Sequence, residues 1–238
     1  MTATAVRADT VASVLLTKRC GDLAAVAGQV LTSGERARAD AYRDAADRRD
    51  FRAAHLLVRQ VAARLTGTSP DALAVIQQCA RCGGPHGRPI IAGHPGVHIS
   101  LAHTRGAVIA AASAEPVGVD IESLRRPRFD PALLAPALTA GELQAVSESA
   151  NQHAAVLRQW VRKEALVKAG EGSLDRLREL DLGHLGISGD HDPAPVRTTL
   201  GPRWPELSLA DRVDAGSGVV FAVIASGRLE LTGAPAGP

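Results

Sequence analysis

Leu31-Thr-Ser-Gly-Glu35 recurs in the second half of the chain as Leu138-Thr-Ala-Gly-Glu142, 107 residues later. A second pair of matching stretches, Gly106-Ala-Val-Ile-Ala110 and Gly218-Val-Val-Phe-Ala222, is separated by 112 residues. Both separations are close to half of the 238-residue chain, and in each half a helical pattern precedes a strand pattern. Internal repetition of this kind indicates a duplicated architecture. We therefore predict an α+β fold, a pseudo-dimer of two similar α+β halves with an active-site cleft between them.

The division between the halves is expected near Glu115-Pro116. It gives an N-terminal half over residues 1–115 and a C-terminal half over residues 116–238, with a disordered tail at 233–238. Hydrophobic periodicity predicts helices over 52–65 and 151–169. Residues 79–96, which carry Gly, Pro and His, are expected to form a loop. Strands are predicted over 97–101, 107–113, 117–121, 185–188, 196–200 and 219–225.

Composition excludes several classes of protein. The 27 basic and 25 acidic residues leave a net charge of +2, and the two Trp, one Tyr and three Phe make no stacking platform, so nucleic-acid binding is not expected. No apolar run approaches the roughly 20 residues of a membrane helix, and the N-terminus lacks a signal-peptide pattern. Three cysteines are too few for a disulfide scaffold. The expectation is a cytoplasmic monomer.

Two carboxylates stand two residues apart at the end of a strand-like run, Val117-Gly-Val-Asp120-Ile-Glu122. Because side chains alternate along a strand, Asp120 and Glu122 share one face. Like charges this close repel each other unless a cation or protons intervene, and oxygen-only ligation suits Mg²⁺. The alternative is a pair of solvated carboxylates at a strand end.

The predicted helix over 151–169 carries an acid in an apolar stripe. On a helical wheel Glu164 lies about 40° from Trp160, and Lys168 lies about 80° from it. A carboxylate that faces a core requires a cation or a hydrogen-bond donor. The alternative is a surface ion pair between Glu164 and Lys168, four residues apart.

Cys79-Ala-Arg-Cys82, followed by His86, has part of the spacing of a zinc site. A closed site needs a fourth ligand, and no downstream partner has finger-like spacing. The alternative is a loop with buried thiols.

Basic groups are scattered near the predicted loops: Arg48, Arg49, Arg52, Arg88, His103, Lys163 and Lys168. Together with the carboxylates they favour a magnesium-dependent phosphate chemistry. The chain has neither a GxxxxGK[ST] phosphate loop nor a GxGxxG fingerprint.

The motifs, taken in order, resemble the 4′-phosphopantetheinyl transferases of the surfactin-synthetase-activating type. Val117–Glu122 is similar to the family's G-[VI]-D-x-E strand, and Trp160-Val-Arg-Lys163-Glu164-Ala-Leu-Val-Lys168 to its W-x-x-K-E-[AS]-x-x-K helix. His86-Gly-Arg88-Pro89 and Ile99-Ser-Leu-Ala-His103-Thr104 are similar to its G-[KR]-P loop and S-x-S-H-[ST] segment. The early helix at Ala53–Arg59 and the Leu138-Thr-x-x-Glu142 motif agree as well. The resemblance spans about residues 31–225.

The resemblance implies a pseudo-dimer with coenzyme A in its cleft. Asp120, Glu122 and Glu164 would hold Mg²⁺ on the coenzyme A pyrophosphate, which Lys168 would contact. Lys163 would be either phosphate-facing or structural. Arg88 and His103 would contact the nucleotide end, together with an early basic residue placed at Arg49, with Arg48 as the alternative.

Two departures separate this chain from the family pattern. Ala102 stands where the family often has Ser beside the histidine. After Lys168 the glycines of the family's K-A-x-G-x-G-L segment are shifted, to Gly170 and Gly172. The acidic positions and both lysines are intact, so activity is expected.

The implied reaction moves the 4′-phosphopantetheine arm of coenzyme A to a serine of an acyl or peptidyl carrier protein and releases 3′,5′-ADP. Asp120, Glu164 and Lys168 are its candidate catalytic residues. Glu164, or a water on the metal, would accept the serine proton. Two alternatives are a magnesium-dependent nucleotide phosphohydrolase at the same carboxylates and a zinc-stabilised interaction module built on Cys79, Cys82 and His86.

Overall fold

The computed structural model describes residues 11–17, 20–27, 30–77, 79, 82–84, 87–125, 131–187, 198–201, 203–226 and 228–233. Its α-helices are α1 Cys20–Ala27, α2 Ser33–Asp40, α3 Ala45–Thr66, α4 Pro131–Leu134, α5 Ala140–Glu148 and α6 Gln152–Ala169. Its 3₁₀ turns are η1 Pro70–Ala72, η2 Ala135–Ala137, η3 Leu174–Glu179 and η4 Gly183–Leu185. Its strands are β1 Val11–Thr17, β2 Val75–Gln77, β3 Pro89–Ile91, β4 His98–Thr104, β5 Ala107–Ser113, β6 Val117–Ser123, β7 Thr198–Thr199, β8 Leu207–Asp214, β9 Val219–Ser226 and β10 Arg228–Gly233. The predicted α+β class is confirmed.

The strands form two sheets. The first has the order β10-β1-β5-β4-β3-β2, and the second has the order β6-β9-β8-β7. Strands before Pro116 therefore lie in the first sheet and strands after it in the second, with one exception. The last strand, β10, returns to the first sheet and pairs in parallel with β1.

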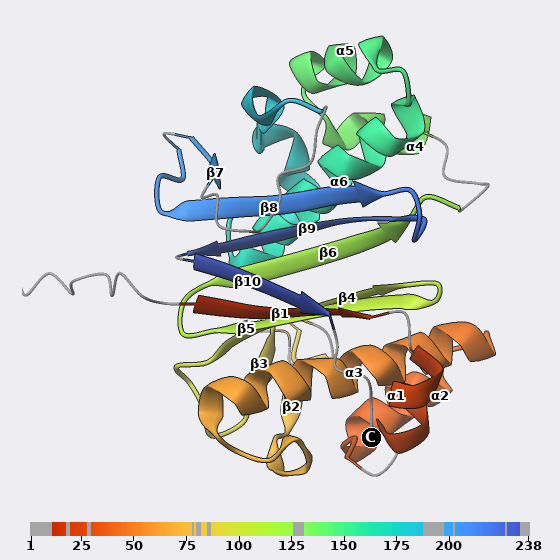
Figure 1. The fold of residues 1–238 in the computed structure, drawn as a ribbon, viewed down its shortest axis with the longest axis vertical. Helices are drawn as coiled ribbons and strands as arrows, with labels where there is room; N and C mark the ends of the chain where they lie inside the picture. The colour runs from red at the N-terminus through yellow and green to blue at the C-terminus, as the bar shows by residue number, and fades with distance from the viewer. Residues whose placement is uncertain are drawn as a thin grey trace, which may run out of the picture.

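The elements stack in four layers, helices on sheet on sheet on helices (Figure 1). Helix α3 covers the outer face of the first sheet, where Leu57 and Val61 are fully buried against it. Helix α6 covers the outer face of the second sheet in the same way. Between the sheets lies a third apolar cluster, to which Val119 of β6 and Ile109 of β5 belong.

The repeat seen in the sequence corresponds to a repeated local structure. Thr32 and Glu35 form a capping box at the start of α2, and Thr139 and Glu142 form one at the start of α5. Each buried glutamate then binds a buried cation of the long helix that follows. Glu35 pairs with Arg59 of α3, and Glu142 pairs with Lys163 of α6. The two glutamates thus fix equivalent helices in both halves of the chain.

Several sequence-based boundaries differ from the structure. The predicted loop over 79–96 contains the short strand β3, and the predicted strand over 185–188 is replaced by η4, which Gly186 follows with a φ of 64°. Strand β8 was not predicted, because its polar end carries Asp211, Arg212 and Asp214, which break the apolar pattern. His86, residue 188, residues 196–197 and the tail at 234–238 lie outside the described residues, while residue 233, predicted to belong to the tail, ends β10. Within the described ranges, no helix is long and apolar enough to cross a membrane.

Candidate active site

Strand β6 turns Gly118, Asp120 and Glu122 towards helix α6, while Val119 and its alternate neighbours enter the core between the sheets. Helix α6 passes directly over Gly118, so only a residue without a side chain fits at this position. A Cβ at this position would stand 1.9 Å from the carbonyl oxygen of Ala165 and 2.5 Å from the amide nitrogen of Ala169. Glycine therefore lets the helix approach close enough for its side chains to reach the carboxylates of the strand.

Asp120 and Lys168 form an ion pair between β6 and α6. The Lys168 Nζ donates to Asp120 Oδ1 at 2.6 Å. The second oxygen, Oδ2, is buried and has no hydrogen-bond partner. Burial raises the pKa of Asp120 above its ordinary value, against the opposing effect of Lys168. Burial alone would lower the pKa of Lys168, but the negative charge of Asp120 outweighs it and raises that pKa.

Glu164 lies beside this pair, with Oε2 4.0 Å from Lys168 Nζ. Burial and the negative charge of Asp120 raise the pKa of Glu164 to about 7, and Glu122 adds to this effect. Trp160, Glu164 and Val167 are only half-buried, whereas Val156 is buried. The expected core-facing stripe is therefore covered at Val156 and partly covered further along, where Trp160 and Val167 still pack against the apolar cluster.

Asp120, Glu122 and Glu164 offer only oxygen donors, the chemistry that Mg²⁺ prefers. The unpartnered, buried Oδ2 of Asp120 fits a cation, because a buried carboxylate oxygen without a partner is costly. Within the described residues, no three His, Cys, Asp or Glu side chains are close enough together to hold a metal ion. Among the residues that the structure describes, Lys168 provides a positive charge in direct contact with Asp120.

Two predicted nucleotide-binding residues of the N-terminal half reach this neighbourhood. Arg88 donates through Nη2 to the carbonyl oxygen of Ala169, the last residue of α6, at 3.4 Å. His103 lies on β4, and its ring meets Tyr42 and Phe51 edge-on. Burial lowers the pKa of His103, and the positive charge of Lys168 contributes to the lowering, so the two groups are within electrostatic range.

Arg49 and Arg48 lie on α3 and are held by local partners. Arg49 forms an ion pair with the buried carboxylate of Asp50 at 2.9 Å, which raises the pKa of the guanidinium. Asp50 also accepts the amide hydrogen of Gly106. Arg48 donates to the carbonyl oxygen of Tyr42. Neither arginine contacts the Asp120–Lys168 pair.

Lys163 does not join the group. Its side chain is fully buried, with Nζ 2.5 Å from Glu142 Oε2. The same amine donates to the carbonyl oxygens of Ala137 and Leu177. Of the two roles considered for Lys163 in the sequence, the geometry therefore favours the structural one.

Ser100 belongs to the segment that resembles the S-x-S-H-[ST] motif, but the sequence analysis gave it no role of its own. Its buried Oγ accepts the amide hydrogen of Val119 at 3.0 Å. Ser100 precedes His103 on β4, and Val119 precedes Asp120 on β6. The bond therefore links the strand that carries the histidine to the strand that carries the carboxylates. Its signal in the sequence is a serine between the apolar residues Ile99 and Leu101.

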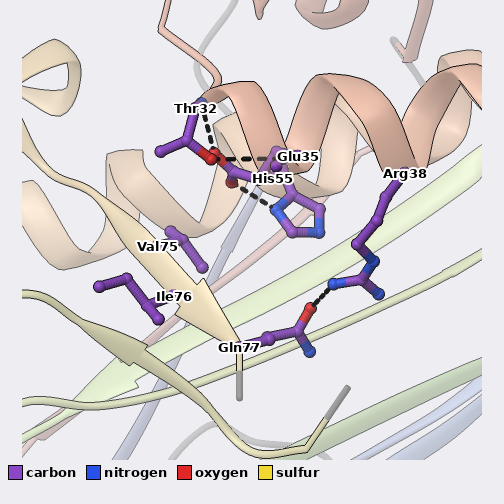
Figure 2. Close-up of a pocket in the computed structure, with 8 residues that line it drawn as sticks. Thr32, Glu35, Arg38, His55, Val75, Ile76 and Gln77 are labelled. Atoms are coloured by element: carbon purple, nitrogen blue, oxygen red, sulfur yellow. Dashed lines mark hydrogen bonds and ion pairs between the residues drawn. The ribbon is translucent and has the colours of Figure 1, made fainter. Parts of the chain in front are cut away.

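A separate pocket of about 210 Å³ lies in the N-terminal half, and none of the predicted site residues lines it. Figure 2 shows Glu35 bonded to both Thr32 and His55, and Arg38 reaching Gln77 across the opening. The buried Glu35 carboxylate is fully engaged there by Arg59 as well. We assign this pocket no role in the site.

Comparison with known proteins places the site in context. Residues 116–216 match a family model described as the 4′-phosphopantetheinyl transferase superfamily. The chain is 29% identical over 152 residues to a 4′-phosphopantetheinyl transferase of Bacillus subtilis. That alignment covers 60% of this chain and 65% of the relative, just under two thirds of its length. Both findings confirm the resemblance that the motifs carry, and the segment matched by the family model contains all of β6 and α6.

Proposed function

We propose that this protein is a 4′-phosphopantetheinyl transferase, which moves the 4′-phosphopantetheine arm of coenzyme A to a serine of an acyl or peptidyl carrier protein. The observation that carries the proposal is the Asp120–Lys168 ion pair with Glu164 beside it. All three residues lie in the segment that matches the superfamily model.

The charges around the site suit an anionic substrate. Lys168 and Arg88 lie at the end of α6, where the pyrophosphate of coenzyme A would find two cations. His103 is within electrostatic range of Lys168 and is assigned to the nucleotide end. We assign a contact with the 3′-phosphate to Arg49. Its guanidinium would then either break its ion pair with Asp50 or bind both groups at once.

Asp120, Glu122 and Glu164 are the residues that would hold Mg²⁺. When bound, the ion would neutralise the pyrophosphate oxygens and keep the diphosphate oriented. The unpartnered Oδ2 of Asp120 supports this assignment, since Oδ1 is already bound to Lys168.

In the proposed reaction, the carrier serine oxygen forms a bond to the β-phosphorus of coenzyme A. The bond from that phosphorus to the bridging oxygen breaks, and 3′,5′-ADP leaves with the electron pair. Glu164 is half-buried and is the group assigned to accept the serine proton. Lys168 is assigned to stabilise the charge that develops on the departing phosphate.

The test is intact-mass spectrometry of an apo carrier protein incubated with this protein, coenzyme A and Mg²⁺. The expected result is a gain of roughly 340 Da on the carrier, the mass of one phosphopantetheine group, which a chelator abolishes. Both an acyl and a peptidyl carrier are needed, because the site residues do not distinguish them. Cleavage of coenzyme A with no modified carrier of either type would replace the proposal with a phosphohydrolase.

A further inference from the structure

Strand β6 forms one edge of the second sheet, and this edge lies against β4 of the first sheet. In an antiparallel ladder only every second residue of an edge strand directs its amide towards the neighbouring strand, so the other amides face the open edge. Val119 is one of the latter, because its amide donates to Ser100 Oγ of β4, at 3.0 Å. Both residues are buried. A side chain of the first sheet therefore closes the edge of the second sheet at this point.

The alternation of side chains along β4 gives Ser100 and His103 opposite faces of the strand. Ile99 belongs to the apolar cluster beneath α3, whereas Ala102 belongs to the cluster between the sheets. Ser100 therefore faces the second sheet, like Ala102, and His103 faces α3, where its ring meets an aromatic ring of that helix. Three residues of strand, about 10 Å, separate the serine from the histidine. The strand thus holds His103 at a set distance from the bond to β6.

The apolar cluster between the sheets holds them together without fixing how far one strand lies along the other. Burial of apolar surface is non-directional, whereas a hydrogen bond requires a narrow range of distances and angles. Removing Ser100 Oγ would leave the amide of Val119 buried without this acceptor, which is costly. A shift of β6 relative to β4 would relieve that cost and would move Asp120, the next residue of β6.

We propose that Ser100 is a positioning residue, whose bond to Val119 sets the distance between the two ends of the coenzyme A site. The nucleotide end is at His103 on β4, and the diphosphate end is at Asp120 on β6. This inference rests on the proposed function, which assigns those two ends. Ser100 acts through Val119 and is assigned no contact with coenzyme A. A ligand that spans both ends depends on their distance, whereas a ligand that occupies one end does not.

The test compares the dissociation constants of two probes, measured on the full chain in the presence of Mg²⁺. Coenzyme A spans both ends of the site, whereas adenosine 3′-phosphate has the nucleotide end and no diphosphate. We expect Ser100→Ala to weaken the binding of coenzyme A about tenfold, because the two ends no longer fit the ligand together. The binding of adenosine 3′-phosphate should change less than about twofold. A loss of stability alone would lower the folded fraction and weaken both probes alike.

Two further variants separate the hydroxyl from its surroundings. Ser100→Thr keeps the hydroxyl in a residue that strands accept, so it should bind coenzyme A within about threefold of the unchanged chain. Ser113→Ala is the matched control, because Ser113 is also buried in the first sheet and its Oγ accepts the amide hydrogen of Glu115, two residues away. That bond is local, so both dissociation constants should stay unchanged. If Ser100→Ala does not fold, Ser100→Cys replaces it, since a thiol fills similar space but is a weak acceptor.

Three results would overturn the proposal. One is an equal weakening of both probes in Ser100→Ala, another is no weakening of either, and the last is a selective loss as large in Ser100→Thr or Ser113→Ala. The proposed transfer is measured separately, by modification of a carrier protein. A chain that binds coenzyme A but modifies no carrier would contradict the proposed function and leave the comparison of the two probes valid. A chain that binds neither probe would contradict both.

Discussion

Lys163 Nζ and Glu142 Oε2 stand 2.5 Å apart, and neither side chain is exposed to solvent. Glu142 also accepts the amide hydrogens of Thr139 and Leu182. The pair therefore joins α5, α6 and the segment before η4 through one carboxylate. This arrangement makes Lys163 part of the scaffold that holds α6, one residue away from Glu164.

Lys163→Met should destabilise the protein, because it leaves the buried Glu142 carboxylate without its cation. Removing one partner of a buried pair costs about 3–5 kcal/mol. Urea denaturation followed by circular dichroism measures the loss. Lys163→Met with Glu142→Leu, which removes both charges, should recover part of it. If the double variant is no more stable than Lys163→Met, the unpaired carboxylate is not the cause.

Asp120→Asn should abolish transfer while the protein stays folded, because it removes the charge that pairs with Lys168. We expect a loss of about 100-fold or more, the size of effect that a lost electrostatic contact in an active site produces. The measurement is the initial rate of carrier modification by mass spectrometry. Arg176→Gln, which changes an exposed residue of η3, is the control and should keep the full rate. A normal rate in Asp120→Asn would remove the site assignment.

Gly118→Ala should separate β6 from α6, because the added Cβ would overlap the backbone of Ala165. Overpacking of a tight contact costs about 1–3 kcal/mol, and backbone cannot move aside as a side chain does. The variant should therefore lose stability and also lose transfer, since the reach from Lys168 to Asp120 would change. Gly141→Ala offers the matched control, as a Cβ there meets no atom within 4 Å. Equal stability of both variants would contradict the close approach.

Lowering the pH should reduce the stability of the N-terminal half, because the Glu35 carboxylate becomes protonated. Burial alone would raise its pKa, but hydrogen bonds from His55 and Arg59 hold it at about 2, below the ordinary 4.5. A lowered pKa in the folded state means that the charged pair stabilises the fold above pH 4.5, and that this stability is lost as the pH falls towards 2. Denaturation of Glu35→Gln should show a shallower fall over that range than the parent. Glu179→Gln, at an exposed position, should follow the parent curve.

Elements that follow a local sequence pattern could be predicted from the sequence, and elements that depend on contacts between distant residues could not. The capping boxes at Thr32 and Thr139 are local patterns, and the strand over 107–113 is apolar up to Ser113, so both could be found without the fold. Strand β8 could not be found, because buried Asp211 is stabilised there by Arg158 and Arg162, which are distant in sequence. A buried polar residue looks like a surface residue until its partners are known.

The sequence pointed to the residues of the candidate site one by one, but not to the ion pair that two of them form. Period-two alternation correctly placed Asp120 and Glu122 on one face, because that rule is purely local. The wheel placed Glu164 in an apolar stripe that was expected to face the core. In the structure Glu164 is only half-buried, because an apolar stripe does not show how completely that face of the helix is covered. The choice of Lys168 rather than Lys163 as the partner of Asp120 depends on tertiary contacts alone.

The parallel pairing of β10 with β1 has a consequence for synthesis on the ribosome. Residues 11–17 leave the ribosome early, but their partner at residues 228–233 is made more than two hundred residues later. Until then β1 has an open edge that is free to pair with another strand, a known hazard for aggregation. The first sheet is therefore completed only after the second has been made. A nascent chain stalled before residue 228 would be a sensitive target for chaperones and proteases.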